Sequence, residues 1–385
     1  MRLDHKIGII GGGPAGSSMA LYLASMNFDV CVFEKKLFPR ETVCGEFLSH
    51  EVIAILKELN LYEKFLLLKP NKITKLKLFN SGKLTAESNF EFDAFSLKRS
   101  TFDNFLLSEA QQRGATVYQP AMISDIKKNK DCFNLYTEDK KHFFVEKLIA
   151  AFGKSNIVDR NTGRNNAIKK TGYNGVKFHI KDKTSEGFPS EEIHIYIEGG
   201  FYLGVSSPLA GELTFCYLEN RISNKQNPYE KISKMFTCKN YEGLDYKIER
   251  NDFKNIKKYG IGKIYFGNKE LVKDDVFYIG DSARVIAPLT GDGIGMAFET
   301  SKLLSSLLYE FEKKNWDTEY LKAIYINKWN HLFLPRLKLA KSIQNLVLKK
   351  SIRDLSLTAI SLFPSVLNFL TKKTRSLKIN LTENI

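Results

Sequence analysis

The sequence has few cysteines, few histidines and no long apolar run. Its cysteines form no C-x-x-C pair, which argues against a disulfide framework and favours a reducing compartment; they are Cys31, Cys44, Cys132, Cys216 and Cys238. Only six histidines occur, without zinc-ligand spacing, so no metal site is predicted. No signal-like segment precedes the first apolar run, and a cytoplasmic protein is therefore expected.

The chain has 385 residues, of which 43% are apolar, so it can bury a large core and is not expected to be disordered. We find no internal repeats and no low-complexity linkers. The formal charge of +15 is concentrated near the end of the chain. Between Arg336 and Lys378 ten basic residues face one acid, Asp354.

The same terminal segment places apolar residues at helical spacing, which predicts a basic amphipathic helical tail over residues 331–385. Such a tail suits a membrane surface or an acidic partner such as an acyl carrier; an ordinary packing helix with a solvated basic face is the alternative. Pro364 interrupts it, so a membrane-spanning helix is not expected. Nucleic-acid binding is disfavoured because no reading motif accompanies the charge.

The start of the chain carries a dinucleotide-binding pattern. Gly11, Gly13 and Gly16 form G-x-G-x-x-G after a short apolar run, an alanine-rich helical pattern follows, and a second apolar run ends at Glu34. The glycines allow a tight turn and close approach to a pyrophosphate, whose charge the N–H groups of the helix start attract. Glu34 is expected to accept hydrogen bonds from a ribose.

A second cradle is predicted far downstream. The short apolar strand beginning at Val276 leads into Gly280 and Asp281, and the run from Pro288 to Gly295 continues into a helix. A carboxylate can hold a ribityl or ribose hydroxyl, and glycines admit a flat ring. The positive end of a helix stabilises the anion formed when an isoalloxazine is reduced.

The middle of the chain alternates apolar and polar residues with period two, around 176–181, 193–198 and 213–217. This predicts half-exposed antiparallel strands. We therefore expect an α/β (α+β composite) fold with a Rossmann-like domain, an inserted antiparallel β substrate domain and C-terminal helices. The nucleotide domain is predicted from 1–72, 97–168 and 261–330, and the β-rich substrate domain from 73–96 and 169–260.

Together with Arg99, these motifs resemble the FAD-dependent p-hydroxybenzoate-hydroxylase-like superfamily, and the stretch from Phe38 to Glu51 resembles its geranylgeranyl reductase branch. The resemblance implies FAD as cofactor. No second Rossmann fingerprint is present, so the flavin is expected to be reduced by NAD(P)H that docks transiently or by another protein. The cofactor-binding residues it implies are Gly11, Gly13, Pro14, Ala15, Gly16, Glu34, Lys35, Arg40, Arg99, Met122, Gly153, Gly280, Asp281, Pro288, Gly291, Asp292, Gly293 and Ile294.

Cys44 is the candidate catalytic residue. It follows Arg40 and precedes an expected helix, and both cations and helix N–H groups favour a thiolate; the alternative is a buried structural cysteine. Cys31 is expected in the core. His179 and His194 fall on the polar phase of strands and are expected to be exposed. Phe201 and Tyr202 are candidates for a cavity wall or, more simply, for the core.

The sequence departs from the resembling branch in three places. It reads Ala151-Phe152-Gly153 without a carboxylate, which questions direct use of NADPH; it has Glu46 where the branch often has glycine; and Gly199–Val205 replaces the branch's substrate motif.

The expected function is an FAD-dependent oxidoreductase that reduces C=C bonds in a lipophilic or carrier-bound substrate. The alternatives are an FAD-dependent monooxygenase and a non-catalytic lipid-carrier or escort protein. A flavin halogenase is disfavoured because the W-x-W-x-I-P motif is missing and the only tryptophans are Trp316 and Trp329. The basic tail leaves membrane association open.

Overall fold

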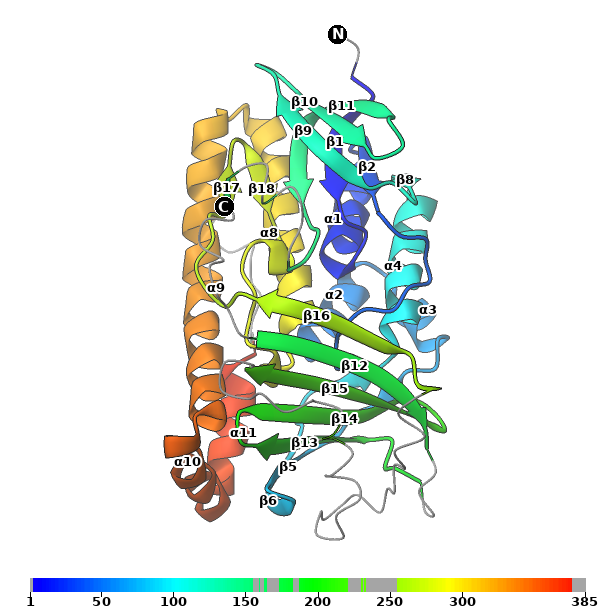
Figure 1. Ribbon diagram of the computed structural model, residues 1–385. Coiled ribbons are helices and arrows are strands. Elements are labelled where there is room, and N and C mark those ends of the chain that lie inside the picture. Colours follow the sequence, from blue (N-terminus) through cyan, green and yellow to red (C-terminus); the bar gives the residue numbers. More distant parts are fainter. Residues whose placement is uncertain are drawn as a thin grey trace.

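The computed structural model describes residues 3–154, 159, 163–164, 173–182, 187–220, 230, 232 and 255–375. Cys238, most of the expected β-rich segment after residue 220 and the end of the tail from residue 376 lie outside these ranges. The molecule is elongated, with a nucleotide-binding layer at one end, a second sheet at the other and long helices along one side (Figure 1).

The first sheet has the strand order β17-β18-β11-β1-β2-β8, with β10 and β9 attached beside β11. Its central strands are parallel and apolar, and β2 is buried along its whole length. Helix α1 follows β1 and packs between α4 and α8, as a β-α-β unit requires. The bounds are β1 His5–Ile10, α1 Pro14–Ser25, β2 Val30–Phe33, α2 His50–Glu58, α3 Tyr62–Leu66, α4 Arg99–Gln112, β8 Thr116–Tyr118, β9 Ile123–Lys128, β10 Phe133–Thr137, β11 His142–Ala150, β17 Val272–Lys273, β18 Val276–Tyr278 and α8 Gly293–Lys314.

The second sheet has the order β16-β12-β15-β14-β13-β5-β6 and is antiparallel except where β5 pairs with β13. Both segments expected to form the β-rich layer contribute strands to it, and β16 straddles the expected boundary at residue 260. The bounds are β5 Lys75–Asn80, β6 Lys83–Asn89, β12 Tyr173–Lys181, β13 Glu192–Glu198, β14 Phe201–Leu209, β15 Glu212–Asn220 and β16 Lys258–Ile264. A small sheet links the layers through β3 Phe47–Leu48, β4 Asn71–Lys72 and β7 Phe95–Ser96.

The polar face of the second sheet is largely covered, which corrects the expectation of exposed histidines. His194 is buried against Glu192 and Tyr196, His179 is mostly buried against Glu46, and the side chain of Lys177 is fully buried. Apolar and polar residues do alternate along these strands, as predicted. Part of the polar face, however, contacts charged residues of other segments instead of water. Strand patterning alone cannot distinguish these two surroundings.

The C-terminal helices join the two ends of the molecule. Helix α9 (Thr318–Leu348) is continuous through Pro335, so the expected boundary between residues 330 and 331 lies inside it. It is followed by α10 (Lys350–Leu362) and α11 (Pro364–Lys373), which pack against β6 at the foot of the molecule (Figure 1).

Candidate active site

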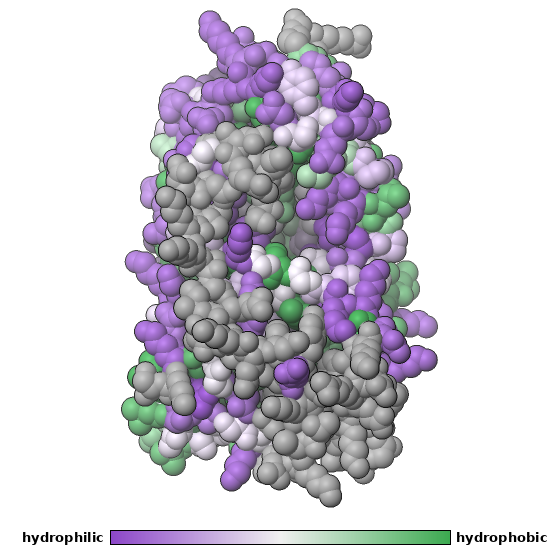
Figure 2. Space-filling model, viewed as in Figure 1, coloured by the Kyte–Doolittle hydropathy of each residue, from purple (hydrophilic) through white to green (hydrophobic). Residues whose placement is uncertain are grey.

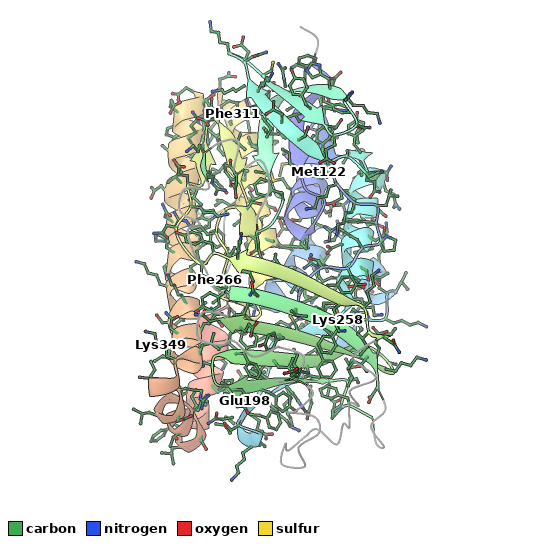
Figure 3. The ribbon with its side chains drawn as sticks, in the orientation of Figure 1. Met122, Glu198, Lys258, Phe266, Phe311 and Lys349 are labelled. Atoms are coloured by element: carbon green, nitrogen blue, oxygen red, sulfur yellow. The ribbon has the colours of Figure 1, made fainter. Side chains whose placement is uncertain are left out.

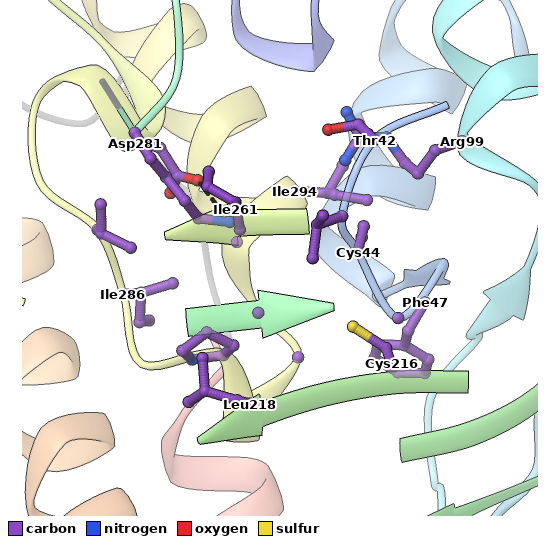
Figure 4. A pocket seen from close by; sticks show the side chains of 18 of the residues that line it. Thr42, Cys44, Phe47, Arg99, Cys216, Leu218, Ile261, Asp281, Ile286 and Ile294 are labelled. Atoms are coloured by element: carbon purple, nitrogen blue, oxygen red, sulfur yellow. Dashed lines mark ion pairs between the residues drawn. The ribbon is translucent and has the colours of Figure 1, made fainter. Parts of the chain in front are cut away.

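One cavity of about 760 Å³ lies between the two sheets. The two predicted cradles meet in it, although they are far apart in the sequence: Gly11 and Gly13 line it together with Asp281, Gly291 and Gly293. In Figure 4 Asp281 lies on one side of this cavity and Arg99 on the other, with Cys44 and Cys216 along its wall.

The N-terminal cradle is shaped for a diphosphate. Gly11 has a φ of 107°, and a Cβ there would lie 2.5 Å from the carbonyl oxygen of Ala151. A Cβ on Gly16 would lie 1.8 Å from the carbonyl oxygen of Gly11, so Gly16 permits close packing of helix on strand. Gly13 caps α1 without a side-chain hydrogen bond, which leaves the N–H groups of its first turn available to an anion.

Glu34 is nine-tenths or more buried and lines the cavity at the end of β2. Its carboxylate accepts hydrogen bonds from the backbone N–H groups of Gly12 at 2.9 Å and Lys36 at 3.0 Å, and Arg40 lies 3.5 Å away. This arrangement fixes the carboxylate beside the glycine turn, where the ribose of a dinucleotide is expected.

Arg99 opens helix α4 and is held by Asp103, to which it donates two hydrogen bonds at 2.7 and 2.8 Å. Burial opposes its charge, but the Asp103 carboxylate outweighs this and raises the pKa of the guanidinium. The Cys44 thiol also interacts with Arg99. Arg40, by contrast, is directed to Asp103 and Glu34.

The surroundings of Cys44 therefore differ from the expected ones. Its cationic neighbour is Arg99, and the short strand β3 separates it from helix α2, so the start of that helix does not directly follow the thiol. Cys44 is half-buried and lines the cavity, and its Sγ accepts a hydrogen bond from the N–H of Glu46. Cys31, as expected, is in the core.

The second cradle combines a carboxylate, a glycine turn and a helix start. Asp281 lies in the turn η2 (Gly280–Ser282) and faces Lys154 at 3.7 Å. The turn η3 (Pro288–Thr290) ends at Gly291 with a φ of 65°, and α8 begins at Gly293. Gly293 and Ile294 in its first turn line the cavity, so the positive end of this helix lies where a flavin ring is expected.

Asp292 does not face this cavity, contrary to expectation. It is fully buried and pairs with Arg336 of α9 and with Arg375 beyond α11. Glu299 pairs with the same Arg336 guanidinium. Burial is the largest cause raising the pKa of both acids, to about 6 for Asp292 and about 8 for Glu299. This cluster fastens the glycine turn to the C-terminal helices.

Sequence reasoning also missed a buried cluster behind Cys44, centred on Glu46. The Glu46 carboxylate receives hydrogen bonds from Lys177, Thr214 and the N–H of Arg99, and it lies 3.0 Å from His179. Burial acts to raise its pKa, yet His179 and Lys177 together lower it to about 2. Glu46 thus joins the second sheet to the Cys44 loop. In the sequence, the only feature that singled out Glu46 is that it stands where the resembling branch often has glycine.

The cavity continues into an apolar chamber walled by the second sheet and the C-terminal helices. Tyr202 lines this chamber, whereas Phe201 packs in the core of the sheet. The other apolar walls are Leu76, Leu78, Ile193, Ile195, Ile197, Leu218, Ile264, Val285, Leu289, Ile343, Val347, Ile360, Leu367 and Leu370.

Most predicted cofactor-binding residues line the cavity, namely Gly11, Gly13, Pro14, Ala15, Glu34, Lys35, Arg40, Arg99, Met122, Gly153, Asp281, Pro288, Gly291, Gly293 and Ile294. Figure 3 labels Met122 in the segment between the strands β8 and β9. Gly16, Gly280 and Asp292 lie behind the wall. A Cβ on Gly280 would lie 2.9 Å from the Cβ of Ala15, so this glycine allows close packing beneath the cradle.

One cavity therefore holds a glycine turn before α1, an acid after β2 and the start of a second helix. This combination is that of a flavoprotein that binds FAD. The model of the FAD binding domain family matches residues 4–324, and the chain belongs to this family. It is an FAD-dependent oxidoreductase.

Among its relatives, the 1H-pyrrole-2-carbonyl-[peptidyl-carrier protein] chlorinase of Pseudomonas fluorescens is 26% identical over 81% of this chain and 77% of its own length. The p-nitrophenol 4-monooxygenase PnpA of Pseudomonas putida shares the fold with a TM-score of 0.77 at 14% identity, over 97% of both chains. The flavin-dependent halogenase CmlS has a TM-score of 0.75 at 19% identity, over 98% of this chain and 74% of its own.

These three relatives are named as a chlorinase, a monooxygenase and a halogenase, and none of them is named as the C=C reductase expected from the sequence. The resemblance to a geranylgeranyl reductase branch is not supported by them. The loop around Cys44 and Gly45, which suggested that branch, therefore does not identify the reaction.

Proposed function

We propose that this protein is an FAD-dependent monooxygenase acting on a lipophilic or carrier-bound substrate. The observation that carries the proposal is the single cavity with two unlike ends. Its upper part offers a phosphate cradle and charged side chains, and its lower part is an aliphatic chamber. Bound FAD would supply two-electron transfer and, when reduced, activation of dioxygen.

The residues at the junction of the two parts hold the reacting centre. The start of α8 is placed to offer N–H groups to the ring, the Gly291 turn admits its flat face, and Asp281 is placed for the ribityl chain. Arg99 interacts with Cys44 and holds its loop in place, and we propose that Cys44 transfers a proton at the substrate end of the cavity. The expected substrate domain is then the second sheet, which forms the chamber wall.

The chamber sets the substrate class. Its walls are mainly aliphatic, with Tyr202 among them, so they favour an elongated apolar group, each buried methylene of which contributes about 0.8 kcal/mol. The chlorinase relative acts, by its name, on a carrier-bound acyl group. A thioester-bound chain that inserts its apolar end into the chamber fits both observations.

Halogenation is a second candidate, because the chlorinase relative matches across most of the chain. The missing W-x-W-x-I-P motif argues against it, and hydroxylation remains the first proposal. The two reactions differ in their product, since one adds oxygen and the other adds halogen.

The test uses FAD-loaded protein with photoreduced flavin and an extract of the source cells that retains both lipids and acyl-carrier thioesters. The extract is analysed by untargeted mass spectrometry under isotopically heavy dioxygen, with chloride and bromide present. Products carrying one heavy oxygen support the proposal. Products that gain two hydrogens without oxygen would restore the C=C reductase, and halogenated products would establish the second candidate.

A further inference from the structure

The helices α10 and α11 form a corner with an apolar outer surface. Four large side chains on it are more than half exposed: Leu355 at 77%, Leu362 at 69%, Phe363 at 62% and Phe369 at 56%. Val366 and, at the end of α9, Leu346 add further exposed apolar area. In Figure 2 hydrophobic residues gather at the lower left, where Figure 1 places α10 and α11.

The inner face of the same helices is apolar as well. Leu357 and Leu367 are buried, and Ile360, Leu367 and Leu370 line the chamber. The outer face of the same helices combines these large apolar side chains with small polar ones such as Thr358 and Ser361. Large apolar side chains that remain exposed on a short amphipathic helix are typical of helices that rest in a lipid interface.

Charge is confined to the ends of this segment. No charged residue occurs from Leu355 to Thr371. Exposed charged residues border it instead: Lys341 and Lys349 at the end of α9, Asp354 directly before Leu355, and Lys373 at the end of α11. Figure 3 labels Lys349 where α9 meets α10. An uncharged apolar stretch with basic ends is characteristic of segments that rest in a lipid interface.

The geometry agrees with resting on one leaflet and not with crossing it. Within the described residues no single helix is long and apolar enough to cross a membrane, and the pair Ile352–Leu362 and Ser365–Lys373 meets that criterion only together, across a bend of 107°. Each helix is shorter than the roughly 20 residues that a span requires. The exposed residues Leu362 and Phe363 lie at this bend, between α10 and α11.

We propose that the corner formed by α10 and α11 is a membrane-docking surface that inserts Leu362, Phe363 and Phe369 into the interface of an anionic lipid bilayer. An acidic carrier protein would need cationic groups within its contact surface, but here the centre is uncharged and the lysines lie at its rim. The docking does not depend on the reaction proposed above, because it is a property of the outer face of these helices.

The test is sedimentation of the full-length, FAD-loaded protein with vesicles of phosphatidylcholine, with and without phosphatidylglycerol. The wild type is expected to bind both, and the anionic vesicles more tightly, by about fivefold for each lysine at the surface. The double variant Phe363→Glu/Phe369→Glu is expected to lose at least about tenfold in partitioning, since each phenylalanine no longer leaves water.

The matched control is Leu67→Glu, because Leu67 is also highly exposed, at 79%, but lies beyond helix α3. This variant should bind vesicles like the wild type. FAD absorbance and the unfolding temperature verify that all variants fold. Absence of vesicle binding by the wild type, or equal binding by the double variant, would overturn the proposal. A third result would also overturn the proposal. If the wild type binds an acyl carrier protein but no vesicles, and the double variant loses that binding, the surface belongs to a protein partner.

Discussion

Arg375, just beyond α11, donates a hydrogen bond from Nη2 to the carbonyl oxygen of Thr290 over 2.7 Å. Its other amino group contacts the carbonyl oxygen of Gly291 and the carboxylate of Asp292. The end of the C-terminal helices is therefore attached to the glycine turn of the second cradle. The tail is part of the site and not an appendage of it.

Replacing Arg375 with alanine is expected to weaken FAD binding. The variant removes the donor that holds the Thr290 and Gly291 carbonyl groups and leaves buried Asp292 with Arg336 alone. Loss of a charged buried hydrogen bond costs about 1.5–3 kcal/mol, or roughly ten- to hundredfold in affinity if the turn loosens. Titration of the apoprotein with FAD measures this, and exposed Lys373→Ala is the control. If Arg375→Ala and Lys373→Ala bound FAD with equal affinity, the contact of Arg375 with the glycine turn would not contribute to FAD binding.

Glu46→Gln is expected to lower stability near neutral pH and to matter less in acid. The folded pKa of Glu46, about 2, lies below its ordinary value, so the ionised carboxylate stabilises the fold above about pH 4.5 and this contribution disappears as the pH falls toward 2. The full difference corresponds to about 3 kcal/mol. Urea unfolding of both proteins across this pH range measures it.

The exposed residue Glu87 on β6 supplies the control for that experiment. Glu87→Gln should give a small and nearly constant change in unfolding free energy. If the difference in unfolding free energy between the wild type and Glu46→Gln stays the same from neutral to acidic pH, this carboxylate is not held in its ionised form by Lys177 and His179.

Gly11→Ala is expected to abolish or strongly weaken FAD binding, because its Cβ would collide with the Ala151 backbone. Gly114 is a matched control, since its φ of 103° is nearly that of Gly11 while a Cβ there meets open space. Gly114→Ala should cost about 1–3 kcal/mol from backbone strain alone and keep the flavin. If both variants retained FAD equally, the N-terminal turn would not be the phosphate cradle.

Cys44→Ala tests the proposed proton donor at the junction of the cavity. The variant should keep FAD, since the thiol belongs to the wall and not to either cradle, and should lower kcat by about 10²-fold or more. Cys132→Ala, at the turn before β10, is the control and should leave the rate unchanged. If Cys44→Ala formed product at the wild-type rate, Cys44 would only line the cavity and would not take part in the reaction.

Local patterns allowed the sequence to predict the cradles but not what supports them. Gly11, Gly16 and Glu34 belong to one contiguous unit, so their spacing already defines their geometry. Glu46 and Lys177 lie far apart in the chain, and only the packing of β12 on the Cys44 loop brings them together. Asp292 was predicted to face the ring because its neighbours do, but Arg336 and Arg375 draw its carboxylate to the other side.

The reaction was harder to predict than the fold, because one scaffold serves several flavin reactions. Cys44 and Gly45 suggested a reductase, whereas the relatives described above are named as a chlorinase, a monooxygenase and a halogenase. The burial of Lys177 and His194 could likewise not be predicted from their strands. Apolar and polar residues alternate in the same way whether the polar side chains meet water or charged partners.

The most direct test of the central claim is an experimental structure of the protein with FAD bound. The account predicts the adenosine at Glu34, the diphosphate at the Gly11–Gly13 turn and the flavin ring at the Gly291–Gly293 helix start, with the aliphatic chamber left open beside the ring. FAD bound elsewhere, or a ring lying away from the start of α8, would contradict it.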